Sequence, residues 1–297
     1  MGEKCEILLS KEEYSPGETV EGRVECDFDD ETKVRAIRIK IRGRAKAYWK
    51  EGHTNVYCAE EVYIQDESDL ISGETTFVAG LYSYPFKFTL PQHLPSSMFE
   101  DHGNVKYSVQ ATVDRPWAFD YESKKVFKVY SYYDPKTIED FKKPVEVTEE
   151  KTPFQLLDES GPIIIQANLP VKGYLPSQII KFHIKVKNNS KINVDKIIFK
   201  AVQGFEFHIK ENVKTMEACV GDELTVENSL VEPQCECSWN LEIKLPPDMF
   251  NGNLDACNVI KIFWELQGEV HLPFPYTNFM IRVPFIVGAA PLGQNSA

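Results

Sequence analysis

Five basic residues stand at every second position of one short segment of the chain. Residues 38–46 read RIKIRGRAK, so the basic positions alternate with aliphatic or small ones. Successive side chains of a β-strand point to opposite faces, so this spacing places all five cations on the outward face and Ile37, Ile39 and Ile41 on the inward face. Such a row can bind a phosphorylated tail or a phosphoinositide headgroup. The candidate anion-binding or partner-binding residues are Arg38, Lys40, Arg42, Arg44 and Lys46.

The same row also fits a solvated face whose charges are neutralised by neighbouring acids. If the strand at Thr19–Phe28 pairs with the basic strand as a hairpin, Glu25 lies opposite Arg38. In the same register Glu21 lies opposite Arg42, and these cross-strand pairs neutralise half of the row. Whether the row is a binding site or a salt-bridged surface stays open. The positions beyond the reach of these acids, and the better candidates for an anionic ligand, are Arg44 and Lys46.

Cysteine supplies a second kind of candidate chemistry, as a nucleophile or a metal ligand. The chain has seven cysteines, an odd number with no CxxC pair of the kind found at zinc or thioredoxin-type sites. Cys235 and Cys237 are the one close pair, and on a strand their side chains share a face. They are the candidate reactive thiols. Two small residues on a buried face explain the pair more simply, because no further metal ligand lies nearby in the sequence.

No other pattern indicates catalysis or a bound cofactor. The six histidines are scattered without metal-ligand spacing, and no GxSxG, P-loop or GxGxxG sequence occurs. Glu100, Asp101 and His102 could hold a divalent cation, but a solvated loop explains them better, because a hard cation needs about six oxygens from several directions. The sequence predicts a protein that is not an enzyme and has no cofactor or metal site.

The segment Arg115-Pro116-Trp117 supports two interpretations. Trp and Arg dominate the energetics of protein interfaces, so Trp117 could be an exposed anchor for a partner. Alternatively, Pro116 ends a strand and Trp117 covers the edge of a sheet. The second interpretation is favoured, because the fold alone then explains both residues.

Short alternating runs predict the elements that position these side chains. Residues 84–91 and 105–113 alternate between apolar and polar side chains, and similar runs bounded by Gly, Pro, Asn and Asp recur in both halves. Helical periodicity is nearly absent. The predicted fold class is all-β, with two tandem antiparallel β-sandwich domains of the immunoglobulin-like kind.

A repeat within the chain indicates that the two domains are similar. The Tyr-x-Pro turn at residues 14–16 recurs at residues 174–176, and the strands that follow recur at the same offset. Such a unit is too long for a solenoid repeat of about 20 to 50 residues. Residues 134–160 are charged and lack alternation, so a connection lies there. The predicted organisation is an N-terminal domain at 1–145, a linker at 146–160, a C-terminal domain at 161–288 and a short tail at 289–297.

Composition limits the partners and the compartment. The net charge is −12, which argues against nucleic-acid binding and against a uniformly basic membrane-docking surface. No apolar run approaches the ~18 residues of a membrane-spanning helix. The N-terminal residues are too charged for a secretory signal. We therefore expect a cytoplasmic protein in which any anion site is local.

Several separated motifs resemble one family. They are AGLYSYPF at residues 79–86, LPSS at 94–97, GNVKY at 103–107 and DRPWAFD at 114–120. In this order they resemble the N-terminal domain of the arrestin family, in particular its α-arrestin (arrestin domain-containing) branch. VKGYLP at residues 171–176 resembles the opening of the arrestin C-terminal domain, with Ser177 in place of the usual Gly. The resemblance covers nearly the whole chain and implies two arrestin-type β-sandwiches.

The resemblance implies a non-enzymatic adaptor in membrane-protein trafficking and signal regulation. α-Arrestins link membrane cargo to ubiquitin ligases and endosomal sorting through Pro-Pro-x-Tyr motifs. The family thus implies a ubiquitin ligase among the partners, but no Pro-Pro-x-Tyr, the motif that recruits it, occurs in this sequence. The implied partners are cytoplasmic tails of receptors or transporters and anionic phospholipid. The implied location is the cytoplasm, with peripheral association at the plasma membrane or endosomes.

A second class of function follows from the thioredoxin-interacting branch of the same family. Proteins of that branch are soluble regulators that act through a reactive thiol, which Cys235 or Cys237 would supply here. Alkylation of the native protein separates the two hypotheses. A thiol-dependent regulator needs one accessible cysteine of lowered pKa, whereas an adaptor needs an exposed basic or edge-strand surface.

Overall fold

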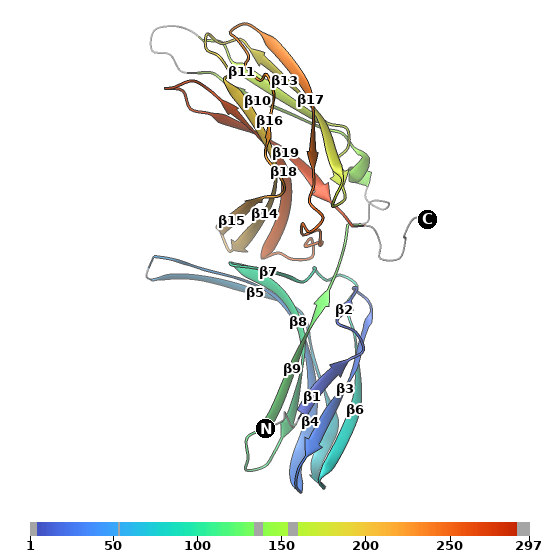
Figure 1. The fold of residues 1–297 in the computed structure, drawn as a ribbon. Helices are drawn as coiled ribbons and strands as arrows, with labels where there is room; N and C mark the ends of the chain where they lie inside the picture. Colours follow the sequence, from blue (N-terminus) through green and yellow to red (C-terminus); the bar gives the residue numbers. More distant parts are fainter. Residues whose placement is uncertain (1–4, 53, 134–138, 154–159, 290–297) are drawn as a thin grey trace, which may run out of the picture. The chain divides into compact units, whose positions relative to one another are not determined.

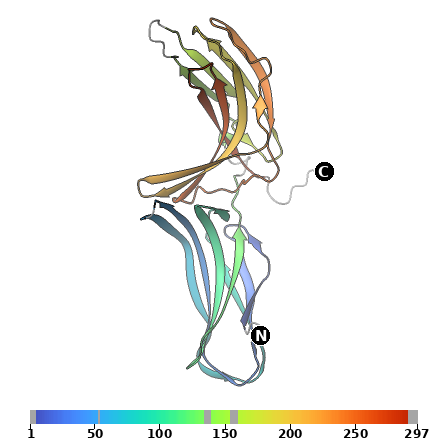
Figure 2. The same cartoon turned by 60° about the vertical axis from the view of Figure 1, so that its left-hand side comes forward.

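The structure is a computed structural model that describes residues 5–52, 54–133, 139–153 and 160–289. These residues form β-strands and one 3-10 turn, η1 (Glu139–Lys142). In each half of the chain two sheets face one another, as Figures 1 and 2 show. The predicted all-β fold with tandem β-sandwiches is confirmed. Among the described residues, no helix has the length and apolar character needed to cross a membrane.

The first half of the chain contains a small sheet and a large one. The small sheet has the order β1-β3-β6, formed by β1 (Cys5–Leu9), β3 (Thr19–Phe28) and β6 (Gly80–Thr89). The large sheet has the order β2-β9-β8-β4-β5, and β7 also pairs with β8. Its strands are β2 (Glu13–Tyr14), β4 (Thr32–Glu51), β5 (Asn55–Phe77), β7 (Met98–Glu100), β8 (Gly103–Asp114) and β9 (Tyr121–Val129).

The second half repeats this plan. One sheet has the order β10-β11-β13-β17, formed by β10 (Val145–Lys151), β11 (Ile163–Leu169), β13 (Ile179–Asn188) and β17 (Glu236–Lys244). The other sheet has the order β12-β19-β18-β14-β15, with β16 paired to β14. Its strands are β12 (Gly173–Tyr174), β14 (Lys196–Ile209), β15 (Asn212–Cys219), β16 (Leu224–Thr225), β18 (Ile260–His271) and β19 (Phe279–Val287).

The repeated turn has the same structural role in both halves. Tyr14 ends the two-residue strand β2, is buried, and pairs in parallel with Val129 at the end of β9. Tyr174 ends β12, is also buried, and pairs in parallel with Val287 at the end of β19. The repeat read from the sequence therefore corresponds to a repeat in topology.

The described chain divides into two compact units whose limits differ from the predicted domains. The first unit consists of the described residues within Met1–Ser131, Glu206–Lys214 and Gly252–Lys261, and the second of those within Tyr132–Phe205, Thr215–Asn251 and Ile262–Ala297. The predicted domain boundaries stay predictions.

Part of the segment that the sequence assigned to the linker forms a strand. β10 pairs with β11 along its whole length, and the side chains of Val145 and Val147 pack against the core of the second unit. The charged residues between and after these valines hid the alternation. Residues 154–159 of the predicted linker and residues 290–297 of the predicted tail lie outside the described residues.

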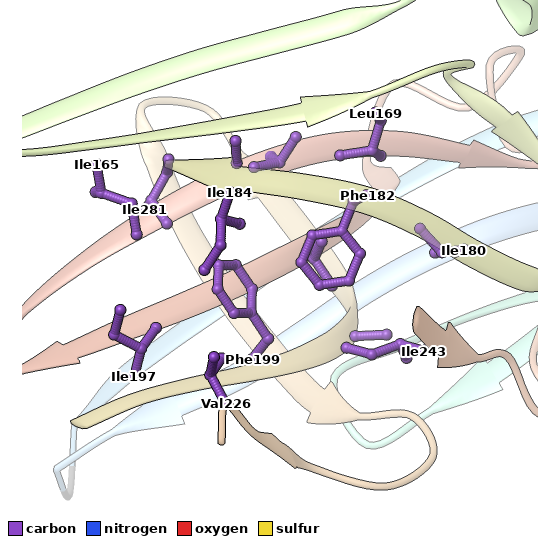
Figure 3. Packing of buried hydrophobic residues seen from close by; sticks show 14 of the residues in the cluster. Ile165, Leu169, Ile180, Phe182, Ile184, Ile197, Phe199, Val226, Ile243 and Ile281 are labelled. Carbon is purple, nitrogen blue, oxygen red and sulfur yellow. The ribbon is translucent and has the colours of Figure 1, made fainter. Parts of the chain in front are cut away.

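The alternating strands bury one face each. Ile37, Ile39 and Ile41 of β4 have 0% exposure, as predicted. In the second unit, Phe182 and Ile184 of β13 point toward Phe199 of β14 (Figure 3). The rings of Phe182 and Phe199 pack edge to face, with 5.0 Å between their centroids. Burying one such side chain contributes about 1.5–3 kcal/mol. A register slip of one residue would move a whole row into water, so the pattern fixes the pairing.

The LPSS motif ties the segment before β7 to the end of the first unit. The Ser96 hydroxyl donates to the Ser131 carbonyl at 2.6 Å and accepts from the Ser131 amide at 2.9 Å. The Ser97 hydroxyl accepts from the Val129 amide at 2.9 Å. The buried Tyr107 hydroxyl donates to the Pro95 carbonyl at 2.8 Å. These bonds satisfy polar groups that would otherwise be costly to bury, so the motif is structural.

Candidate anion-binding site

The basic row lies on β4, between β5 and β8 of the large sheet. Along β4 the aliphatic side chains are buried and all five basic side chains are half-buried, which is the predicted alternation. Gly43 stands in place of an aliphatic residue in this series, because a Cβ atom at this position would lie 2.5 Å from the ring of the buried Tyr107. The pairing with β5 shifts register between Gly43 and Arg44. The fold therefore presents the row as one face of a sheet.

The predicted hairpin between the strand at Thr19–Phe28 and the basic strand is wrong. β3 pairs with β1 and β6 of the small sheet, so Glu25 lies opposite Ser83 and Glu21 lies opposite Lys87. The turn at residues 29–31 carries the chain from one sheet to the other. Alternation identifies strands, but it does not say which strands share a sheet.

The acids that neutralise the row come from β5 and from the end of β8. The Arg38 guanidinium lies 3.4 Å from a carboxylate oxygen of Asp69 and 3.3 Å from one of Asp114. The Lys40 ammonium lies 3.7 Å from a carboxylate oxygen of Glu67. All of these pairs are partly exposed, and such pairs each contribute about 0–1 kcal/mol to stability.

Glu60 of β5 neutralises two guanidinium groups at once. One of its carboxylate oxygens accepts from Arg42 at 2.5 Å, and the other accepts from Arg44. Burial raises the pKa of Glu60, but the two guanidinium groups more than offset this effect, so its pKa lies below the ordinary value. The expectation that Arg44 lies beyond the acidic partners is therefore wrong. Glu60 occupies the position from which an incoming anion would contact Arg42 and Arg44.

Two cations near Glu60 have no ion pair within the described chain. Lys46 lies opposite Asn104 and Glu60 in the register, and its ammonium lies 5.6 Å from the centre of the Tyr48 ring. Lys106 lies directly opposite Arg44. Like charges at directly opposite positions repel one another. An anion that binds here relieves that repulsion.

A groove of about 480 Å³ lies beside these cations. Its basic lining comes from Arg44, Lys106 and Lys128, while Phe99 and Val126 provide apolar lining and are 83% and 46% exposed. The groove is also lined by Tyr130 and Asn104, and the buried side-chain oxygen of Asn104 has no hydrogen-bond partner among the described residues.

This combination of groups suits a peptide that carries both acidic and apolar side chains. The cations can pair with carboxylate or phosphate groups, the apolar side chains can be covered, and the amide oxygen can accept a hydrogen bond. The alternation pattern alone does not reveal that β8 and β9 contribute to this groove. The alternation of residues 105–113 places Lys106 on the outward face, but only the pairing of β8 with β4 brings it beside Arg44.

The two candidate thiols lie in different environments. Cys235 is exposed in the turn before β17, whereas Cys237 is half-buried on β17 and packs against the core. Burial raises the pKa of Cys219 and Cys257. No group of three or more His, Cys, Asp or Glu side chains in the described residues is arranged to hold a metal ion. The assignment of Cys235 and Cys237 as reactive thiols stays a prediction.

Trp117 does not cover the edge of the sandwich, so that interpretation is wrong. It has a left-handed backbone (φ 63°), and its side chain is fully exposed, as is that of Phe119 at 94%. Arg115 fixes the loop by donating from Nε to the Phe119 carbonyl at 2.9 Å and by stacking 3.6 Å from the centre of the Tyr121 ring. Packing inside the described unit does not explain the two exposed rings.

The two halves match two domain models of one family. The model for the arrestin (or S-antigen) N-terminal domain matches residues 5–136, and the model for the arrestin C-terminal domain matches residues 159–292. The chain belongs to the arrestin family. The N-terminal model spans strands β1 to β9 and the C-terminal model spans β11 to β19, whereas β10 lies between the two matched ranges.

The curated relatives that the chain resembles are arrestin domain-containing proteins. Arrestin domain-containing protein 17 of Caenorhabditis elegans is 25% identical over 97% of this chain and 71% of its own length. Arrestin domain-containing protein 4 of Mus musculus is 26% identical over 95% of this chain and 70% of its own. Arrestin domain-containing protein 1 of Mus musculus is 25% identical, and the aligned region spans 65% of its length. These relatives are therefore longer than the present chain.

Proposed function

We propose that this arrestin is a non-enzymatic adaptor in the trafficking of membrane proteins. In this proposal, the basic face of the large sheet binds an acidic or phosphorylated segment in the cytoplasmic tail of a receptor or transporter. The protein then works in the cytoplasm and associates peripherally with the plasma membrane or endosomes. Endocytosis and endosomal sorting are the processes that such binding would serve.

The observation that carries this proposal is the groove beside Arg44. It joins the cations Lys106 and Lys128 to the exposed apolar side chains of Phe99 and Val126 within a protein whose net charge is −12. Local positive charge on an acidic protein favours a specific anionic partner over general attraction to polyanions. An acidic tail that also carries apolar residues matches both parts of the groove, whereas a lipid headgroup matches only the cations.

The test is reversal of charge at three positions of the row. We expect the triple variant Arg42→Glu, Arg44→Glu and Lys46→Glu to lose binding to peptides from cytoplasmic tails that combine acidic or phosphorylated residues with apolar ones. Vesicles with anionic phospholipid, added in a parallel arm, distinguish a lipid ligand from a peptide ligand. Unchanged binding in both arms would refute the proposal.

A matched control comes from the second half of the chain. One face of strand β13 carries three lysines, Lys181, Lys185 and Lys187. Replacing all three with Glu changes the net charge by the same amount. We expect this variant to bind the tail peptides as the native protein does. Equal losses in the two variants would indicate a general effect of net charge instead of a site.

The thiol-dependent alternative has a separate test. Native protein is treated with an alkylating reagent, and the modified cysteines are mapped by mass spectrometry. Rapid and selective modification of Cys235 or Cys237 would favour that alternative. Resistance of all seven thiols would remove its support.

A further inference from the structure

A pair of cysteines that the adaptor function does not use lies in the first unit. Cys5 begins β1 and Cys26 lies near the end of β3, and both side chains are buried, at 3% and 0% exposure. Their sulfur atoms are 3.8 Å apart, and the Cys26 thiol donates to the Cys5 sulfur. All seven cysteines lie in the described residues, and none of them forms a disulfide.

The strand register determines whether this pair can be joined. Cys5 is directly opposite Cys26 in the antiparallel pairing of β1 with β3. Positions in such a pairing alternate between hydrogen-bonded pairs, about 5.5 Å apart at Cα, and non-hydrogen-bonded pairs, about 4.5 Å apart. Disulfides need a Cα separation of about 4.4–6.8 Å and close Cβ atoms. The non-hydrogen-bonded position brings the side chains closer.

Two backbone hydrogen bonds identify the kind of position that this pair occupies. The Ser10 amide donates to the carbonyl of Glu21, its direct opposite when the β1–β3 register is continued by one residue. Counting back along β1 by alternation makes Cys5 and Cys26 a non-hydrogen-bonded pair. On the other side of β3, the Leu90 amide donates to the carbonyl of Glu18, its direct opposite when the β3–β6 register is continued by one residue. Counting along β3 by alternation makes Cys26 a hydrogen-bonded position with respect to β6, so its amide and carbonyl point away from β1. Both counts agree.

We propose that Cys5 and Cys26 form a disulfide on oxidation, and that this bond links the N-terminal edge strand β1 covalently to β3. A peroxide oxidises one thiol to a sulfenic acid and releases one water. The second thiol then attacks the sulfenic sulfur, the S–S bond forms, and a second water leaves. Two electrons and two protons pass from the thiols to the peroxide. The disulfide bond requires only a small approach of two sulfur atoms that already face one another.

Burial decides when this reaction occurs. The hydrogen bond with Cys5, and then burial, raise the pKa of Cys26, so the closed pair contains little of the reactive thiolate. β1 is a five-residue strand at the edge of its sheet, and terminal edge strands open locally more easily than central strands. Oxidation therefore follows partial opening of β1. Once formed, the buried disulfide is shielded from reductants, and β1 no longer detaches.

The experiment uses the full chain in its folded form. The protein is treated with hydrogen peroxide, remaining thiols are blocked by alkylation, and the protein is digested without reduction for mass spectrometry. We expect a linked peptide containing Cys5 and Cys26, slower amide exchange in β1, and a Tm that rises by several degrees and returns after reduction. Recovery of both cysteines in the alkylated form after oxidation would overturn the proposal. Formation of the link only in denaturant would also overturn it.

Two variants serve as controls. Cys5→Ser removes one partner, so the linked peptide, the slower exchange and the Tm shift should all disappear. Cys58→Ser removes an exposed thiol of the same unit, and this variant should keep all three responses. If Cys5→Ser proves unstable, the linked peptide from the native protein still decides the question. A link between Cys26 and any other cysteine would contradict the proposed site.

Discussion

Replacing Glu60 with glutamine should increase the affinity of the basic face for an acidic peptide. Glu60 accepts hydrogen bonds from both Arg42 and Arg44. The substitution keeps the size of the side chain but removes its charge, so both guanidinium groups become available to an incoming carboxylate. A protein in which the row has no role in binding would not respond in this direction.

The size of the effect follows from the exposure of the groups. The side chains of Arg44 and Glu60 are 30% and 32% exposed, so solvent screens their interaction considerably. A cation near an anionic surface contributes about 1 kcal/mol to binding, which is about fivefold in affinity. We therefore expect Glu60→Gln to bind about fivefold more tightly at low salt. The gain should shrink toward zero near 1 M salt, where the Debye length is only about 3 Å.

Fluorescence anisotropy with a labelled peptide of acidic and apolar residues measures this change. The matched control is Glu21→Gln, which changes the net charge equally but lies opposite Lys87 in the small sheet. Its affinity should equal that of the native protein. An equal gain in affinity in the Glu21 and Glu60 variants would refute the assignment of the site. Unchanged affinity in both variants would also refute it.

Three further predictions concern stability. The native protein should be more stable to unfolding than Glu60→Gln by about 0.2–1 kcal/mol at neutral pH. Because the folded pKa of Glu60 is lowered from 4.5, this difference should be present above that value and vanish as the pH falls below it, as urea titrations at several pH values would reveal. Gly43→Ala should lose about 1–3 kcal/mol in urea unfolding, because the added methyl group would lie 2.5 Å from the Tyr107 ring; an unchanged midpoint would contradict the close packing. Trp117→Ala should change stability by no more than about 0.5 kcal/mol, because the side chain is fully exposed, and a large drop in Tm would show that it packs against the protein.

Local patterns in the sequence were sufficient to predict the strands. Period-two alternation placed Ile37, Ile39 and Ile41 in the core, and all three are fully buried. The alternation reflects a physical requirement of one half-buried strand, so no knowledge of distant residues was needed. The repeated Tyr-x-Pro turn likewise predicted two similar halves.

The partners of those strands could not be predicted in the same way. Pairing Thr19–Phe28 with the basic strand assumed that neighbours in sequence are neighbours in a sheet, but β3 and β4 lie in different sheets. Glu60 therefore went unnoticed as the acid that neutralises Arg42 and Arg44. The pair formed by Cys5 and Cys26 was missed for the same reason. Both interactions depend on strand register, which is a property of the whole sandwich.

The interpretation of Trp117 failed for a different reason. A large aromatic side chain usually contributes to a core, because its burial removes much apolar surface from water. Here the loop after Asp114 turns through a left-handed residue and directs the ring outward. The sequence contained Pro116 as a sign that the strand ends, but it contained no sign of the backbone conformation that follows.

The central claim is that the face formed by β4, β8 and β9 binds an acidic segment of a partner. The most direct measurement is hydrogen–deuterium exchange of the native protein with and without an acidic, apolar tail peptide, repeated with the Arg42, Arg44 and Lys46 charge-reversal variant. We predict protection along β8, β9 and β7 beside the groove in the native protein, and its loss in the variant. Protection confined to other strands, or protection that survives charge reversal, would contradict the claim.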